Sequence, residues 1–192
     1  AIFELNAECS TPISNEADLM NELRLLTLGQ YFADIFQDRI NQYGVPLQFP
    51  SLTFNACDAF CGELKQPFET RDADDLDNPF YWSFFLAAPL VSLTDGQYTE
   101  KKWCGNEEVC NLANGVGAVV MAFLHATLIH SRGEILFSDV QGRIFANKQV
   151  VLFDPQAHTK DGSSGHWDRG RAMIETFMAR HECNRYCLML EL

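Results

Sequence analysis

The chain has 192 residues, of which 47% are hydrophobic, so it is long enough and apolar enough to bury a substantial core. Its net charge of -12 argues against binding to nucleic acid or to an anionic membrane, because both require clustered Lys and Arg, and it favours a basic protein or peptide as partner. The longest apolar run, 116–124, is too short to cross a bilayer, and the N-terminus lacks the basic and apolar regions of a signal peptide.

A long helix is predicted in the first quarter of the chain. Between Asn15 and Tyr43, apolar residues recur at intervals of three and four, which is the spacing of an amphipathic helix packed on a core. Ser14 or Asn15 is expected to cap its start, and the sequence YGVP at 43–46 is expected to end it.

The middle of the chain predicts strands, loops and a second helix. Segment 47–64 is typical of short strands, and the acidic stretch 69–79 is typical of a solvated connection. The aromatic run 80–93 predicts another strand, whereas 94–115 is rich in turn residues and predicts a loop. Residues 116–129 are apolar on almost all sides, which predicts a buried helix.

The last third of the chain predicts a hairpin, a loop and a helix. Segments 134–142 and 149–156 are typical of two strands joined by 143–148. A glycine- and serine-rich loop at 160–170 precedes a final helix over 171–180. This order of elements indicates an α+β fold rather than a regular alternation of strand and helix.

The sequence HECNRYC, residues 181–187, carries three ligands that suit zinc: His181, Cys183 and Cys187. If the chain is helical from Cys183, the two thiolates lie one turn apart on the same face and reach one ion. Spacing alone is equally compatible with two cysteines packed in a core and a histidine at a helix end. A structural site needs a fourth ligand, and the candidates in the sequence are His125, His130, His158, His166, Cys104 and Cys110.

Two further features concern the cellular setting and the extent of the chain. Seven cysteines, an odd number at irregular spacing, do not resemble the paired framework of a small secreted domain, so we expect a reducing compartment, the cytoplasm. Residue 1 is Ala rather than Met, so we expect the chain to be processed or to be part of a longer protein.

Two stretches of the C-terminal half resemble the alpha-kinases, a family of atypical protein kinases. They are AFLHATLIHSRGEILFSDVQG at 122–142, and DPQAH followed by a glycine-rich loop and FMARHECNRYCLMLEL at 154–192. The resemblance is specific over 122–192 and weaker over KKWCGN at 101–106. It implies a protein-kinase-like C-terminal lobe with a closed structural zinc site. It also supplies the fourth ligand, so that the set is His125, His181, Cys183 and Cys187.

The carboxylates of this region suggest a second metal site. In an extended SDVQG segment, Asp139 and Gln141 point to the same side, and Asp154 follows the returning strand. Carboxylate and amide oxygens suit magnesium, which in turn suits phosphates. On these residues alone, ordinary turn chemistry at Asp-Pro and near Gly is the stronger explanation.

The resemblance to the alpha-kinases changes that balance. It implies that Asp139 is the catalytic aspartate and that Gln141 and Asp154 hold magnesium and the phosphates of ATP, so that Asp154 also takes part in catalysis. Such an arrangement is chemically coherent, because phosphoryl transfer depends on positioning, on charge neutralisation and on an acceptor for the hydroxyl proton. His158, also at a family position, is expected to brace the Asp154 loop.

Several family features are missing from the N-terminal part. There is no lysine before Lys65 and no glycine before Gly29, although a kinase clamps ATP with a strand lysine and a glycine-rich turn. An acidic residue of the linker between lobes is replaced near Ala87 and Ala88, and a family Asn is replaced by Asp168. We therefore expect one domain over 1–192, with 1–80 a remnant of the N-terminal lobe plus the long helix and 81–192 the zinc-containing lobe.

Three functions remain open at this point. The first is an alpha-type serine/threonine protein kinase that uses Mg-ATP on a basic protein substrate. The second is a non-catalytic pseudokinase or interaction module in which the zinc-containing lobe is a scaffold. The third is an enzyme of another reaction class that binds a small apolar substrate against the aromatic segment 78–90.

Overall fold

The computed structural model describes residues 2–3, 12–46, 51–64, 82–90, 98–147 and 149–192. The predicted acidic connection 69–79 lies outside the described residues. In the described part, no helix is long and apolar enough to cross a membrane.

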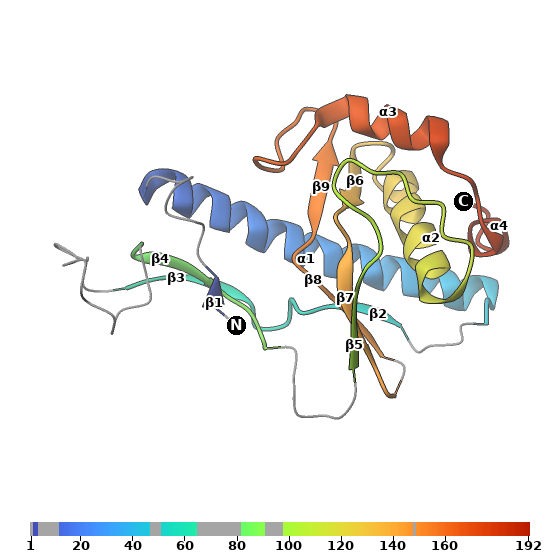
Figure 1. Ribbon diagram of the computed structural model, residues 1–192, viewed down its shortest axis with the longest axis horizontal. Helices are drawn as coiled ribbons and strands as arrows, with labels where there is room; N and C mark the ends of the chain where they lie inside the picture. The colour runs from blue at the N-terminus through green and yellow to red at the C-terminus, as the bar shows by residue number, and fades with distance from the viewer. Residues whose placement is uncertain (1, 4–11, 47–50, 65–81, 91–97, 148) are drawn as a thin grey trace.

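The longest element is helix α1, Pro12–Tyr43, which crosses the middle of the view in Figure 1 along the long axis of the molecule. It begins before the predicted caps, with a proline whose fixed φ suits the first turn of a helix. Asn15 is not a cap: its side chain is fully buried, and its Nδ2 donates to the carbonyl of Phe84 at 3.0 Å. The helix ends as predicted, because Gly44 adopts φ 60° and the amide of Val45 bonds back to the carbonyl of Ile40.

A small antiparallel sheet packs on the first half of α1 (Figure 1). Its strand order is β1-β4-β3, and the strands are β1 (Ile2–Phe3), β3 (Phe60–Glu63) and β4 (Phe84–Ala87). Leu86 of β4 and Leu19 of α1 are both buried at this junction. The two strands predicted from 47–64 and 80–93 therefore contribute to a sheet against the long helix.

The central sheet has four strands in the order β2-β8-β7-β5, in which only β2 and β8 are parallel. The strands are β2 (Leu52–Phe54), β5 (Tyr98–Lys102), β7 (Gln141–Phe145) and β8 (Val150–Phe153). The loop prediction for 94–115 was thus wrong at β5, whose alternation of side chains is masked by four consecutive polar residues. Pairing with β7 compensates for this weak pattern.

The predicted hairpin is divided into four strands by two aspartates. Asp139 and Asp154 adopt φ 52° and 51°, a left-handed conformation that ends one strand and starts another. Beyond the bend, β6 (Ile135–Ser138) pairs with β9 (Gln156–Thr159), while β7 pairs with β8. The result is a single bent ribbon with one aspartate at the bend of each chain segment. Of the linker predicted at 143–148, residues 143–145 belong to β7.

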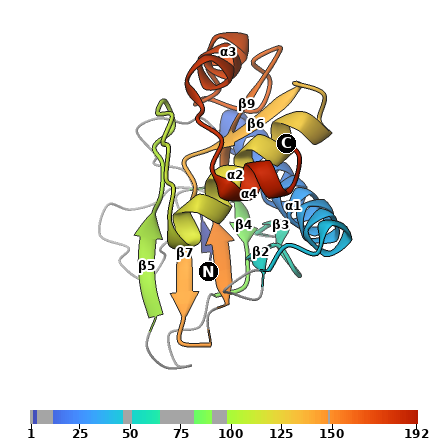
Figure 2. The same ribbon diagram turned by 90° about the vertical axis from the view of Figure 1, so that its right-hand side faces the viewer.

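Three helices complete the C-terminal part. They are α2 (Gly115–His130), α3 (Gly170–Arg180) and α4 (Arg185–Met189). The buried helix predicted at 116–129 is confirmed, because α2 lies inside the fold with residues 117–124 all buried. Its Phe123 packs edge-on against Phe36 of α1 and beside Phe137 of β6, which joins the long helix to the ribbon. Helix α4 lies against α2 (Figure 2).

Candidate active site and metal centre

The bend of the ribbon brings together the polar residues that the sequence singled out. Lys102, at the end of β5, places its Nζ 2.5 Å from Oδ1 of Asp139. Gln141 donates from Nε2 to Oδ2 of Asp154 at 2.9 Å. Because Asp139 is left-handed, the prediction of an extended SDVQG segment was wrong, and the contact across the ribbon arises instead from the pairing of β7 with β8.

The electrostatics of this bend differ for its two aspartates. Burial raises the pKa of Asp154, and the charge of Asp139 raises it further, while Lys102 and the hydrogen bond from Gln141 oppose the shift. Asp139 is 13% exposed and its lysine partner 51% exposed. A divalent cation at the bend would relieve the repulsion between the carboxylates of Asp139 and Asp154. A 180° rotation of the side-chain amide of Gln141 would direct its oxygen, in place of its nitrogen, toward the ion.

A pocket of about 300 Å³ adjoins Asp154, between α1, β4 and the segment that follows β8. Its apolar wall includes Leu19, Leu26 and Leu86, and its polar lining includes Glu22 and Trp167. Leu86 comes from the aromatic segment that was predicted to border an apolar site. The pocket therefore has apolar walls and two carboxylates, Glu22 and Asp154, in its lining.

Glu22 is a residue of this pocket that sequence reasoning missed. Burial raises its pKa to about 7, and the charges of Asp154 and Asp18 add to the shift. The signal was present in the sequence: Glu22 lies three residues after Leu19 and four before Leu26, on the apolar face of the helix. A carboxylate on a buried face indicates either an ion pair or a ligand site, and among the described residues it has no ion-pair partner.

His158 is fully buried and holds two loops together behind the bend. Its Nδ1 accepts from the backbone amide of Arg169 at 3.0 Å, so Nε2 carries the proton and donates to the carbonyl of Asn106 at 2.7 Å. Burial lowers its pKa, although the bond to Asn106 opposes the shift. The prediction that His158 braces the Asp154 loop needs correction, because its partners belong to the 103–114 loop and to the start of α3.

Asp168, in the glycine-rich loop, is the acceptor around which that loop folds. Its carboxylate accepts hydrogen bonds from the backbone and hydroxyl of Thr159, from the backbone and hydroxyl of Ser164, and from the amide of Gly170. Burial opposes ionisation, but these hydrogen bonds prevail and lower the pKa of Asp168. Two carboxylate oxygens can accept more hydrogen bonds than the single oxygen of an Asn side chain, so an aspartate suits the donors that surround this position.

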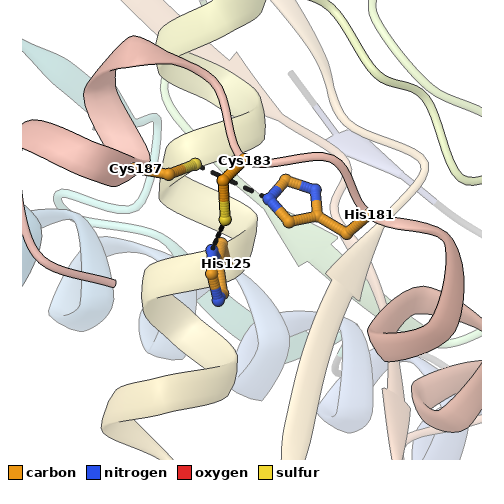
Figure 3. A group of neighbouring side chains, drawn as sticks. All are labelled: His125, His181, Cys183 and Cys187. Carbon is orange, nitrogen blue, oxygen red and sulfur yellow. Dashed lines mark hydrogen bonds between the residues drawn. The ribbon is translucent and has the colours of Figure 1, made fainter.

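The four residues of the zinc prediction lie together at the junction of α2, α3 and α4 (Figure 3). His125 comes from α2, His181 and Cys183 from the turn after α3, and Cys187 from α4. Sγ of Cys183 lies 3.7 Å from Nδ1 of His125, and Sγ of Cys187 lies 3.6 Å from Nε2 of His181. Asn111 fixes the turn by donating to the carbonyl of Arg180 and accepting from the amide of Glu182.

This geometry and donor set fit a tetrahedral zinc ion. All four donor atoms lie within 4.8 Å of one another, and ligands about 2.0–2.3 Å from a zinc ion are separated by about 3.3–3.8 Å. Burial lowers the pKa of His181 to about 4, with His125 adding to the shift, and burial raises the pKa of Cys187 to about 11. Burial also lowers the pKa of His125, so without an ion the charged forms of His125, His181 and Cys187 are all disfavoured.

The other candidates for a fourth zinc ligand lie elsewhere. Cys104 and Cys110 form a disulfide with a Cα–Cα distance of 5.8 Å, which sequence reasoning did not predict. His158 is engaged behind the bend, and His166 packs its ring against Trp167. The disulfide removes the support that the cysteine count gave to a reducing compartment, since disulfides persist mainly under oxidising conditions.

Comparisons with known proteins agree with this geometry. A model of the alpha-kinase family matches residues 5–187. Myosin heavy chain kinase A of Dictyostelium discoideum is 36% identical over 72 residues, which are 37% of this chain and 6% of that protein. Myosin heavy chain kinase B of the same organism is 33% identical over 107 residues, 55% of this chain and 13% of that protein. The chain thus spans a small part of the curated relatives that it matches.

Solved structures share the fold. The alpha-kinase domain of myosin heavy chain kinase A in complex with AMP is 23% identical, with a TM-score of 0.62 over 97% of this chain and 62% of that one. The same domain in complex with ADP gives 22% identity and a TM-score of 0.65 over 100% of this chain and 63% of that one. With the family model covering nearly its whole length, the chain belongs to the alpha-kinase family.

Proposed function

We propose that the chain is an alpha-type serine/threonine protein kinase, which transfers the γ-phosphate of ATP to a hydroxyl of a protein substrate. The observation that carries this proposal is the bend of the ribbon, where Asp139 pairs with Lys102 and Asp154 with Gln141 beside a pocket. Relatives with the same fold have been crystallised with adenosine, AMP, ADP and AMP-PNP, which supports nucleotide binding here.

In the proposed reaction, the substrate hydroxyl oxygen attacks the γ-phosphorus while the bond from that phosphorus to the β,γ-bridging oxygen breaks, and ADP leaves. Asp139 accepts the hydroxyl proton, and its pairing with Lys102 orients the carboxylate. Asp154 and Gln141 would hold magnesium, which when bound neutralises charge on the phosphates. The whole chain, 1–192, acts as one domain in this proposal.

We further propose that His125, His181, Cys183 and Cys187 hold a structural zinc. All four positions are filled by protein, so no ligand position is left for chemistry. The site joins α2 to the segment that connects α3 and α4, and its contribution is stability.

One observation favours a second candidate, a pseudokinase. Strand β4 lines the pocket, and neither β4 nor its described neighbours β1 and β3 contain a lysine. Glu22 on α1 also lacks a cationic partner among the described residues. A kinase normally uses such a lysine on the phosphates of ATP. In this reading, the lobe binds partners without transferring phosphate, and an apolar ligand in the pocket would instead indicate another reaction class.

The test is a thermal-shift titration combined with a transfer assay. For a kinase, ATP with magnesium raises the melting temperature, and labelled γ-phosphate appears on a basic acceptor protein such as myelin basic protein. Asp139→Asn abolishes transfer while the nucleotide still stabilises the chain. An unchanged melting temperature with ATP and magnesium, together with no transfer, would establish the pseudokinase instead.

A further inference from the structure

The disulfide between Cys104 and Cys110 closes a short loop directly after β5. The two cysteines are six residues apart, and the chain between them forms neither helix nor strand. Lys102, the ion-pair partner of Asp139, lies two residues before Cys104. The disulfide therefore restrains a loop that begins beside the proposed catalytic aspartate.

Asn106, at the turn of this loop, is hydrogen-bonded to three other segments. Its Oδ1 accepts from the hydroxyl of Ser138 at 2.8 Å, and Ser138 directly precedes Asp139. Its Nδ2 donates to the carbonyl of Trp167 at 2.9 Å, in the glycine-rich loop. Its own carbonyl accepts from Nε2 of His158 at 2.7 Å. The disulfide loop thus connects the strand before Asp139 to the loop before α3.

Two further contacts hold the disulfide loop against the same segments. Glu107 forms an ion pair with Arg169 at 2.6 Å, and the amide of Trp103 donates to the carbonyl of Val140 at 2.9 Å. The ion pair contributes little, because its side chains are 59% and 44% exposed. Exposed loops held by such contacts open by local fluctuation, and a covalent cross-link restricts that opening. Breaking the disulfide therefore allows the loop to open more often.

The surroundings of the two sulfur atoms suit the reduced form as well. Sγ of Cys104 lies 3.2 Å from the carbonyl oxygen of Glu108, and Sγ of Cys110 lies 3.8 Å from Oε2 of Glu108. A disulfide has no proton to donate, whereas two thiols would donate to these oxygens. Each thiol therefore has an acceptor in place when the disulfide is reduced.

The two cysteines differ in their access to solvent. Cys104 is 4% exposed, whereas Cys110 is partly exposed. A thiolate must reach one sulfur of a disulfide to exchange with it, and accessible disulfides are typically the labile and regulatory ones. The chain also keeps an exposed free thiol at Cys57, unlike small secreted domains whose cysteines are paired throughout. Exposure thus favours reversible exchange at Cys110.

We propose that the disulfide of Cys104 and Cys110 is a reversible redox switch of phosphate transfer, in which the oxidised pair holds the loop that positions Asp139 and reduction lowers activity. The inference rests on the proposed kinase function. In the reduction, the thiolate of a small thiol such as glutathione attacks Sγ of Cys110, the S–S bond breaks, and Cys104 leaves as a thiolate that takes up a proton. A second thiol attacks the mixed disulfide and releases Cys110, which is protonated in turn. Two thiols are thereby oxidised to one disulfide, and the protein gains two electrons and two protons.

The experiment equilibrates the full chain in buffers that contain reduced and oxidised glutathione at several ratios. Free thiols are then alkylated with N-ethylmaleimide, and mass spectrometry determines the state of Cys104 and Cys110. Phosphate transfer and zinc content are measured on the same samples. We expect the pair to pass reversibly from disulfide to dithiol, with kcat falling by about threefold to tenfold and KM for ATP staying within about twofold.

Variants assign the change in activity to this disulfide. The double variant Cys104→Ser, Cys110→Ser is expected to show the low kcat at every glutathione ratio, whereas Cys57→Ser, at an exposed free cysteine, keeps the full response. Hydrogen exchange measures the loop directly. In the reduced chain, the amides of Trp103 and Arg169 should exchange at least about threefold faster, whereas those in the middle of α1 should not change.

Four outcomes overturn the inference: the pair keeps one state over the whole glutathione series, its reduction leaves kcat unchanged, the double variant still responds to glutathione, or the loss of activity follows loss of zinc instead of reduction of the pair. Equal transfer by both states would support the kinase and reject the switch. If neither state transfers phosphate but hydrogen exchange at Trp103 and Arg169 follows the state of the disulfide, the restraint on the loop stands and the kinase proposal fails.

Discussion

The bend of the ribbon and the junction of α2, α3 and α4 both bring together polar side chains from distant parts of the chain. The two groups differ in how these side chains are arranged and exposed. At the junction, four donor atoms lie within 4.8 Å of one another and have few other partners. At the bend, the charged groups are paired side by side, are partly exposed and border a pocket. A closed group of ligands is typical of a structural metal site, whereas an open group beside a pocket leaves room for a substrate.

The largest expected effect concerns the closed group. Cys187→Ala removes a buried ligand, and we expect the melting temperature to fall by more than about 10 °C, because binding of structural zinc contributes folding free energy directly. Scanning calorimetry measures the shift, and elemental analysis of the wild type should give one zinc per chain. Cys57→Ala, at an exposed free cysteine, is the control. A metal-free wild type that is as stable as the zinc-loaded protein would contradict the closed site.

The open group should respond in the opposite way, with loss of activity and little loss of stability. Asp139→Asn is expected to lower kcat for phosphate transfer by about a thousandfold, because it removes the acceptor of the hydroxyl proton. The melting temperature should stay within about 2 °C, since Lys102 is half-exposed and such ion pairs contribute little. Asp38→Asn serves as the control for one lost charge. A variant that keeps full activity would remove Asp139 from catalysis.

A smaller effect, on stability, is expected in the glycine-rich loop that contains Asp168. Asp168→Asn introduces the residue that the family resemblance leads us to expect here, but it exchanges one acceptor oxygen for an amide donor that faces other donors. We expect a loss of about 1–3 kcal/mol in the free energy of unfolding, measured by urea titration. Asp161→Asn, at an exposed position of the same loop, should change it by less than about 0.5 kcal/mol. Equal stabilities would show that the hydrogen bonds to Asp168 are replaceable.

The smallest effect comes from Glu22 and depends on pH. Its folded-state pKa is about 7, above the ordinary value of 4.5, so its neutral form is favoured by folding. Its contribution to stability is therefore fully present below about pH 4.5 and is lost as the pH rises to about 7. Glu22→Gln should be more stable than the wild type by about 1–2 kcal/mol at pH 8, and the difference should vanish at pH 4.

Urea titrations at both pH values, without added magnesium, measure this difference. Glu16→Gln, an exposed residue on the same helix, should show no dependence on pH. If Glu22→Gln gave the same stability difference at pH 4 and pH 8, the Glu22 carboxylate would be ionised at both pH values. Glu22 would then be more accessible to water than its burial indicates.

The sequence predicted the two helices that carry the sites, because the spacing of apolar residues in α1 and α2 follows from their burial. The spacing of residues indicated three of the four proposed zinc ligands, but His125 lies 56 residues before His181, and only the family resemblance selected it. Local rules could not predict that Asp139 and Asp154 bend the chain, because a left-handed aspartate depends on the surrounding fold. The pairing of Lys102 with Asp139 depends likewise on the register of β5 against β7.

Glu22 was overlooked for a different reason. A single carboxylate on the apolar face of the helix does not interrupt the spacing of apolar residues that predicts it. The strand β5 was missed because its polar residues face water on one side and the bend on the other, so they carry no alternation.

The bent ribbon has an evolutionary consequence. Its two aspartates are fixed by the backbone of paired strands, whereas Glu22 and Trp167 come from a helix and a loop that the ribbon does not contain. Sequence changes in the wall of the pocket can therefore alter what the pocket accepts without moving the two aspartates.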